Sequence, residues 1–343
     1  MLAYTLRRLN LFIITLLLLG LVAFSLTHLV PGDPLLHLVA IDGLNQMEVT
    51  ELSRHYHLHQ SYPVQFYHYL GRVLDGDLGL SLATGQPVAD DLLKAAPATL
   101  ELALYAMAVA LLIGIPAGTL AAMYKRSATD YAVQSLALLG YSIPIYWWAL
   151  LLAMLFSLQL GWLPISGRLS LLYEIPRVTG LLLVDILLYD SPLRAAALGD
   201  ALRHLLLPTL VLATVPTTVV TRLMRSALSE VLKQNYIRAA KARGWPLWKV
   251  VWRHGMRNAL LPVGQQVGLQ FSALLTGAMI TESIFNWPGL GNYLINAIYA
   301  RDYPAIQGGL LLLSAFVILV SVLNDLIFMA LDPLKRKRLY AQA

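Results

Sequence analysis

Cysteine is absent from the 343 residues, and charged side chains make up only 13% of them. The first absence excludes disulfide bonds, thiolate metal sites and cysteine nucleophiles. The second excludes an ordinary soluble domain, in which about 25% of the residues are charged. Hydrophobic residues instead make up 58% of the chain. The composition therefore indicates a protein embedded in a membrane.

Long apolar stretches define the expected membrane segments. A spanning helix needs about 20 mostly apolar residues, and such stretches cover residues 9–30, 99–124, 131–160, 205–223, 263–285 and 308–331. Arg7 and Arg8 precede the first stretch, but its apolar run is longer than that of a signal peptide. We therefore expect an all-α, multi-pass membrane protein with six transmembrane helices, the first of them a retained anchor.

Lys and Arg are concentrated in alternate connections. Most of the 25 basic residues lie before the first stretch and within residues 125–126, 222–257 and 335–338. The intervening connections hold more acidic than basic residues. Because basic loops stay on the cytoplasmic side of a membrane, we expect both termini in the cytoplasm. Topology alone explains this basic bias, and no nucleic-acid partner is expected.

The apolar stretches also divide the chain into segments. The expected parts are an anchor helix with an outer loop (1–98), a core transmembrane domain (99–331) containing a long cytoplasmic loop (222–262), and a basic cytoplasmic tail (332–343). Another outer connection contains the apolar stretch 180–188, which is too short to span a membrane. We expect this stretch to form an interfacial or packed helix.

The cytoplasmic loop carries a distinctive pattern at residues 235–244. Adjacent Ala239 and Ala240 would let a short helix sit closely in a partner's groove, and the flanking cations would steer it toward an acidic rim. Gly244 lets the chain reverse direction. The alternative is a helix that only packs on the membrane surface.

This loop resembles the coupling motif of the permeases of ABC importers. Further segments, in the same order along the chain, resemble the dipeptide/oligopeptide/nickel permease family: residues 31–34, 76–81, 98–102, 140–147, 222–226, 257–262 and 281–291. Residues 161–192 look most like the subgroup named for sensitivity to antimicrobial peptides. The first outer loop looks more like that of dipeptide permeases.

The resemblance implies a type I ABC-importer permease architecture in a bacterial cytoplasmic membrane. It implies three kinds of protein partner: a second homologous permease, one or two ABC ATPase subunits, and a substrate-binding protein on the outer side. The ATPase-facing residues would be Tyr236, Arg238, Ala239, Ala240, Lys241 and Gly244, with Arg238 at the position of the motif's glutamate.

Transport rather than catalysis is expected of this chain. It contains no Gly-x-x-x-x-Gly-Lys-Ser/Thr phosphate loop, so ATP and Mg²⁺ would belong to the partner subunits, and we expect no bound cofactor, metal or catalytic residue here. The resemblance implies import of dipeptides or oligopeptides. Cationic antimicrobial peptides, haem, nickel and polyamines remain alternative cargoes, and the direction of transport remains open.

Two ionisable side chains lie within the expected spans. Inserting such a group costs about 2.5–3.5 kcal/mol on translocon scales, so each is a functional candidate. Glu282 would receive a peptide's amino terminus or hold an outer gate by hydrogen bonds, and Asp325 would pair with a polar or cationic group across helices. Ser272, Thr276 and Met279 lie on or near the helical face of Glu282 and suit a polar-lined path, although such residues also pack spans together.

The sequence of Trp287, Pro288 and Gly289 predicts a turn after the fifth span. Proline would fix one dihedral angle and glycine would supply the reversal. We expect a rigid cap that faces the binding protein or the outer gate. A plain stabilising turn is the alternative.

Histidines gather in the first outer loop, at His55, His57 and His59, with His28, His37 and His68 nearby. Such a cluster suits Ni²⁺ or Zn²⁺. On a helix, however, only His55 and His59 share a face, so a metal site is not favoured.

Other classes of membrane protein fit less well. An intramembrane hydrolase would need a His-Glu-x-x-His helix, a Gly-x-Ser-x-Gly turn or paired aspartates in its spans, none of which we find. A secondary transporter would show inverted repeats with broken helices, which are not evident. A structural or sensory membrane subunit remains, and lack of an associated ATPase would identify it.

Overall fold

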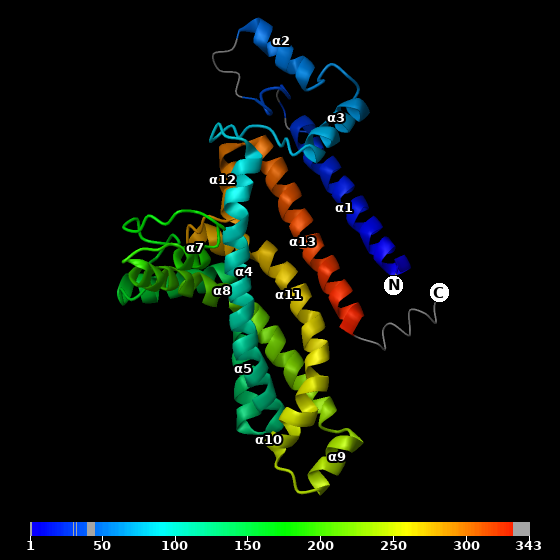
Figure 1. Cartoon of the computed structure of the whole chain (residues 1–343), viewed down its shortest axis with the longest axis vertical. Coiled ribbons are helices and arrows are strands. Elements are labelled where there is room, and N and C mark those ends of the chain that lie inside the picture. Colours follow the sequence, from blue (N-terminus) through cyan, green and yellow to red (C-terminus); the bar gives the residue numbers. More distant parts are fainter. Residues whose placement is uncertain (1, 30, 32, 40–44, 332–343) are drawn as a thin grey trace.

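The computed structural model describes residues 2–29, 31, 33–39 and 45–331, and these fold into helices (Figure 1). The one β pairing among them is an isolated bridge between Leu80 and Pro87. The tail predicted at residues 332–343 lies outside the described part of the chain.

The helices follow one another along the described chain, with a long non-helical connection at residues 160–181. In order they are α1 (Leu2–Leu29), α2 (Gln46–His55), α3 (Tyr62–Leu74), α4 (Val88–Met123), α5 (Ala128–Ser142), α6 (Ile145–Leu152), η1 (Ala153–Gln159), α7 (Leu182–Leu188), α8 (Arg194–Val231), α9 (Asn235–Ala242), α10 (Leu247–Val250), η2 (Val251–Gly255), α11 (Met256–Ile284), α12 (Leu290–Ala300) and α13 (Tyr303–Leu331). The two η segments are π-helical turns that continue the helices before them.

Five helical segments are long and apolar enough to cross a membrane. They are Leu6–Leu29, Val88–Met123, Arg194–Val231, Leu247–Ile284 and Tyr303–Ile327. A sixth span results only if α5 and the segment Ile145–Gln159 are counted together, although they bend by 100°. The all-α, multi-pass expectation is therefore confirmed for the described residues, with five or six spans.

The bend corrects the expectation of one continuous helix over residues 131–160. Ile143 ends α5 in an extended conformation, with φ −80° and ψ 125°, because the ring of Pro144 disfavours a helical residue before it. Other helices are longer than the apolar stretches that predicted them, namely α1, α4, α8, α11 and α13. α4 begins at Val88 rather than at residue 99, so the predicted domain boundary at 98/99 lies inside a helix.

Small residues allow α4 and α8 to pack closely. Ala110, Gly114 and Gly118 recur every four residues on the buried face of α4. A Cβ atom added to Gly114 would lie 2.8 Å from the side chain of Val220 on α8, and one added to Gly118 would lie 2.7 Å from Cβ of Met224. Such small-residue stripes are a common means of packing membrane helices.

The remaining helices place the two ends of the molecule far apart. Figure 1 shows α2 and α3 at one end and α9 and α10 at the other. α1 lies at the periphery beside α13, and its first residues and the last described residues of α13 both lie away from α2 (Figure 1). α10, η2 and α11 together form the span Leu247–Ile284, which connects the α9 end to the centre of the helix bundle.

Candidate functional site

The segment predicted to contact an ATPase forms the short helix α9 and the turn after it. Ile237 is fully buried and Ala240 is 8% exposed, and together with Val250 they form a small core covered by Trp245. Gly244 has φ +79°, a left-handed conformation that favours glycine, and it reverses the chain between α9 and α10. The reversal predicted at this glycine is present.

The exposed face of α9 carries the remaining predicted residues. Arg238, Ala239 and Lys241 are exposed, and the hydroxyl of Tyr236 accepts a 2.8 Å hydrogen bond from Nδ2 of Asn258 on α11. The two adjacent alanines therefore differ in environment. Ala239 is available to a partner, whereas Ala240 packs inside the loop, because neighbouring residues on a helix point in different directions.

Sequence reasoning missed two aromatic residues beside this face. Trp248 and Trp252 are largely exposed, and their spacing of four residues places them on one side of α10 and η2. Lys249 and Arg253 instead lie over the ring of Trp245, at 4.9 and 5.4 Å from its centroid. Large exposed aromatics next to cations are typical of residues that anchor protein interfaces.

A buried ion pair fastens the neighbouring helices to each other. Arg225 on α8 donates two hydrogen bonds of 2.7 Å to the carboxylate of Asp130 on α5, which also accepts one of 2.9 Å from the backbone N–H of Arg126. Asp130 is almost completely buried. The pair fixes the start of α5 to α8 on the side of α9.

Glu282 occupies the centre of a second buried network, at the other end of α11. Its carboxylate accepts hydrogen bonds from the hydroxyl of Thr99 on α4 at 2.6 Å and from the backbone N–H groups of Gly291 and Asn292 at 2.7 and 3.1 Å. These N–H groups belong to the first turn of α12, where a negative charge is favourable. The Thr99 hydroxyl also accepts a 2.8 Å bond from the N–H of Leu290.

The side chain of Glu282 is enclosed by protein in this conformation. The side chain is 0% exposed, and its contacts are hydrogen bonds within the protein, which correspond to the predicted holding role. A peptide amino terminus has no access to the carboxylate. Gly289 is necessary here, because a Cβ atom at this position would overlap the Glu282 carboxylate.

The turn after α11 differs from its prediction in two ways. The left-handed residue is Asn286, with φ 44°, whereas Gly289 is extended, with φ −103° and ψ 178°. Glycine therefore serves the close approach to Glu282 rather than the reversal. Trp287 is 1% exposed and donates a 2.9 Å hydrogen bond from Nε1 to the carbonyl of Ala98, so it is a buried anchor and not an outward-facing cap. Pro288 is exposed.

The other candidates for a transport path do not converge. Met279 packs against α12, Thr276 is exposed, and Ser272 donates a 3.5 Å hydrogen bond from its hydroxyl to the carbonyl of Val317 on α13. Asp325 pairs with Arg8 of α1 at 2.9 Å, which is a cation across helices as expected. Met279 lies beside Glu282, because both come close to Gly291, whereas Ser272, Thr276 and Asp325 occupy other environments in the described structure.

A cavity of ≈ 380 Å³ lies instead between α4, α5, α6 and α8. Four threonines of α8 line it, namely Thr214, Thr217, Thr218 and Thr221. Each hydroxyl donates its hydrogen to a backbone carbonyl, of α8 itself or, for Thr218, of Ala137 on α5. The hydroxyl oxygens can therefore only accept hydrogen bonds from an occupant. The recurrence of threonine at three- and four-residue spacing was the signal for this cavity.

The connection between η1 and α8 is held by charged side chains. Arg168 forms an ion pair with Glu101 of α4, and its guanidinium lies 5.4 Å from the ring centroid of Trp287. The predicted helix at 180–188 is α7, which packs on α8 through the buried Ile186. Burial raises the pKa of Asp185, but hydrogen bonds from Thr179 and from backbone N–H groups outweigh it and hold the pKa below its usual value.

The histidines of the segment between α1 and α4, and His28 at the end of α1, make contacts of other kinds. The rings of His57 and His68 stack at 3.7 Å, Nε2 of His28 lies 3.0 Å from Oε1 of Gln65, and Nδ1 of His37 lies 3.0 Å from the carbonyl of Thr27. In the described part of the chain, no three His, Asp or Glu side chains come together to hold a metal ion.

Comparisons with known proteins cover nearly the whole chain. Residues 114–337 match the family model described as "Binding-protein-dependent transport system inner membrane component", and residues 1–103 match the model of the N-terminal part of such membrane components. The chain is 44% identical over 333 residues to the di/tripeptide transport system permease protein of Pseudomonas aeruginosa, covering 97% of this chain and 98% of that protein.

Two relatives from Escherichia coli K12 show comparable similarity. The putrescine export system permease protein is 42% identical over 341 residues, 99% of either chain. The dipeptide transport system permease protein is 40% identical over 336 residues, 97% of this chain and 98% of that one. A solved structure of the methionine ABC transporter MetNI in an inward-facing conformation shares the fold, with a TM-score of 0.52 at 16% identity over 68% of this chain and 93% of that one.

Proposed function

The chain belongs to the family of binding-protein-dependent transport system inner membrane components, and on this premise we propose that it is the permease subunit of an ATP-driven importer of dipeptides or oligopeptides. The observation that carries this proposal is the similarity to two peptide permeases over almost the full length of each chain. The permease would have six spans, with both termini in the cytoplasm of a bacterium and the bent pair α5 and α6 as one span.

Its partners would supply the energy and the cargo. A second homologous permease would complete the path, one or two ABC ATPases would bind ATP and Mg²⁺, and a substrate-binding protein would deliver the peptide. The ATPase would contact the exposed face of α9, at Arg238, Ala239 and Lys241, and the neighbouring Trp248 and Trp252. Exposed cations and aromatics on this face support that assignment.

In the proposed mechanism, the helix Leu247–Ile284 transmits movement from its α9 end to its Glu282 end. At 1.5 Å per residue, its 38 residues extend about 57 Å. One end adjoins α9 through the core formed by Ile237, Ala240 and Val250, and the other end carries Glu282, which binds α4 and α12. Movement of α9 by an ATPase would therefore shift the helices that Glu282 holds. The threonine-lined cavity would be part of the path opened by this movement.

A second candidate function is polyamine export. The 42% identity with a putrescine export permease favours it, and the acceptor oxygens of the threonine-lined cavity suit an ammonium group as well as a peptide N–H. Both functions would use the same ATPase-driven machinery, but they differ in cargo and direction.

Transport assays in cells distinguish the two. A strain from which the gene for this chain has been deleted, and the same strain with the gene restored, are compared for uptake of radiolabelled dipeptides and tripeptides and for efflux of radiolabelled putrescine. Peptide uptake that depends on the chain supports the proposal. Putrescine efflux that depends on it, with unchanged peptide uptake, overturns the proposal in favour of export.

A further inference from the structure

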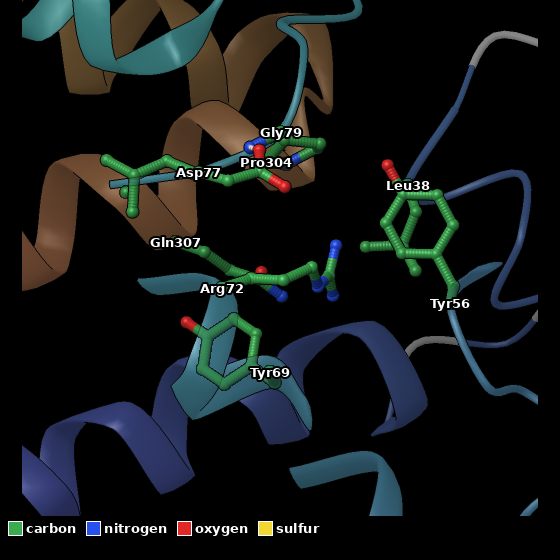
Figure 2. A pocket seen from close by; sticks show the side chains of 10 residues that line it. Leu38, Tyr56, Tyr69, Arg72, Asp77, Gly79, Pro304 and Gln307 are labelled. Carbon is green, nitrogen blue, oxygen red and sulfur yellow. Dashed lines mark hydrogen bonds between the residues drawn. The ribbon is translucent and has the colours of Figure 1, made fainter. Parts of the chain in front are cut away.

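Two adjoining cavities lie where α1 and α3 meet α4 and α13. The larger has a volume of ≈ 530 Å³ and is a partly open groove between α1, α3, α4 and α13. The smaller, of ≈ 20 Å³, lies beside it and is lined by Arg72, Asp77 and Gln307 among others (Figure 2). Tyr69, Leu78 and Gly308 line both cavities. An apolar space therefore adjoins a smaller polar one.

The larger cavity suits a hydrocarbon chain. Aliphatic side chains and glycines line it, and Tyr69 contributes the one polar side chain among the described lining residues. Burying the charged termini of a peptide there would leave them without partners, at a cost of several kcal/mol. Three of the lining helices are candidate spans, and acyl chains are the abundant hydrocarbon beside helices that cross a bilayer.

Most of the surface of α1 beside this cavity is not covered by the protein, although the helix packs along α13. Only 11% of its apolar window is buried within the protein, and side chains such as Leu18 and Val22 are more than half exposed. Membrane helices gain no hydrophobic driving force from packing on each other rather than on lipid. A void between them would lose dispersion contacts on its walls, and an acyl chain restores these contacts.

Tyr69 provides an independent sign of a ligand. Its side chain is 8% exposed, and its hydroxyl has no hydrogen-bond partner among the described residues although the atom is fully buried. Burial raises the pKa of this hydroxyl to about 12, with a smaller opposing effect of Arg72, so the group is a neutral donor. A buried donor without an acceptor is destabilising by about 1–3 kcal/mol, and an acceptor on a ligand in the adjoining groove would remove this cost once the ring turns toward it.

We propose that these cavities bind one phospholipid of the bilayer, with an acyl chain in the groove between α1, α3, α4 and α13 and an ester carbonyl accepting a hydrogen bond from the hydroxyl of Tyr69. The headgroup then lies toward α3, near the Arg72 guanidinium, which itself lies 4.4 Å from the ring centroid of Tyr56. The ≈ 20 Å³ cavity holds about one water molecule rather than the headgroup. The lipid joins the loosely packed α1 to the core of the protein.

The test counts the lipid retained by each chain. The full-length chain, with the subunits that accompany it, is extracted in mild detergent and measured by native mass spectrometry. We expect one adduct of phospholipid mass per wild-type chain. Ala315→Phe fills the groove from α13 and should abolish the adduct. Tyr69→Phe keeps the shape but removes the donor, and should lower occupancy about fivefold, the effect of one neutral hydrogen bond.

Matched controls separate binding from folding. Val22→Phe adds similar bulk on α1 at a side chain that is 57% exposed and does not line the groove, so its adduct should equal that of the wild type. Added phospholipid should raise the unfolding temperature of the wild type more than that of Tyr69→Phe. Equal adducts in all variants, no adduct in the wild type under added phospholipid, or an adduct of peptide mass would each overturn the proposal.

Discussion

The carboxylate of Glu282 on α11 accepts a 2.6 Å hydrogen bond from the hydroxyl of Thr99 on α4, and both groups are buried. The same hydroxyl accepts from the N–H of Leu290 at the start of α12. One side chain therefore joins three helices at the end of the span that begins beside α9. Because no water is available to replace these hydrogen bonds inside the protein, the network stabilises one arrangement of the three helices.

Replacing Thr99 tests this network. Thr99→Val has a similar shape but leaves the Leu290 N–H and one Glu282 oxygen without a partner, so we expect the chain to lose about 2–4 kcal/mol of stability. Thr99→Ser keeps the hydroxyl and should retain most of that stability. The unfolding temperature in detergent measures the effect. Thr276→Val, at an exposed position of α11, is the control. Equal temperatures for the Val and Ser variants would contradict the assignment.

Two glycines near this network should respond differently to a methyl group. Gly289→Ala would force a Cβ atom into the Glu282 carboxylate, so α12 must shift and the protein should be destabilised by about 1–3 kcal/mol. Gly277→Ala places its Cβ in open space within α11 and should be neutral or stabilising by up to about 1 kcal/mol. The unfolding temperatures of the two variants check this prediction. An unchanged unfolding temperature for Gly289→Ala would contradict the close approach of Gly289 to the Glu282 carboxylate.

The ion pair between Asp130 and Arg225 should be sensitive to loss of either partner. Arg225→Met leaves a buried carboxylate without its cation, which costs about 3–5 kcal/mol. The double variant Asp130→Asn with Arg225→Met removes the unpaired charge and should recover part of that loss. A double-mutant cycle on unfolding free energies measures the coupling. If the changes in unfolding free energy of the two single variants add up to that of the double variant, the two side chains are not coupled.

Substitutions at Ala239 and Ala240 should distinguish an effect on ATPase coupling from an effect on folding. Ala239→Trp lies on the exposed face of α9, so we expect normal insertion and stability but loss of peptide uptake. Ala240→Trp overfills the core with Ile237 and Val250 and should destabilise the loop by about 1–3 kcal/mol. Transport assays and protein levels in membranes are compared for both. Full uptake by Ala239→Trp in a stable protein would remove α9 from the mechanism.

Gly244→Ala completes the test of this loop. At φ +79°, an alanine is strained by about 1–2 kcal/mol. No atom lies within 4 Å of the added Cβ, so backbone strain alone accounts for the effect. A modest fall in unfolding temperature is expected, and an unchanged unfolding temperature would contradict the left-handed conformation of Gly244.

Composition and apolar length were sufficient to predict an all-α membrane protein, because lipid allows few other spanning structures. The resemblance to peptide permeases is confirmed by relatives at 40–44% identity. The bend at Pro144 was also present in the sequence as a local signal, since proline restricts the residue before it. The inward position of Ala240 also follows from helical periodicity, because Ala240 and its exposed neighbour Ala239 point in different directions.

The buried networks had no such signal. Thr99 and Glu282 are 183 positions apart, and no local pattern predicts that they meet. The residue type of Gly289 suggests a turn. Glycine is required there for another reason, because the Glu282 carboxylate occupies the space of a side chain, and only tertiary packing determines this. The cavity beside Tyr69 likewise arises where four helices fail to fill a space, which the pattern of any single helix does not reveal.

The central claim is that this chain works as the membrane subunit of an ATPase-driven transporter. The most direct measurement is gentle purification of the tagged chain from its native host, with mass spectrometry of the proteins that accompany it and an assay of ATP hydrolysis. The account predicts a homologous permease, one or two ABC ATPases and hydrolysis of ATP by the purified assembly, with the ATPases lost from a variant that carries Ala239→Trp and Trp248→Ala. Recovery of the chain alone under several mild conditions, without ATPase activity, would contradict it.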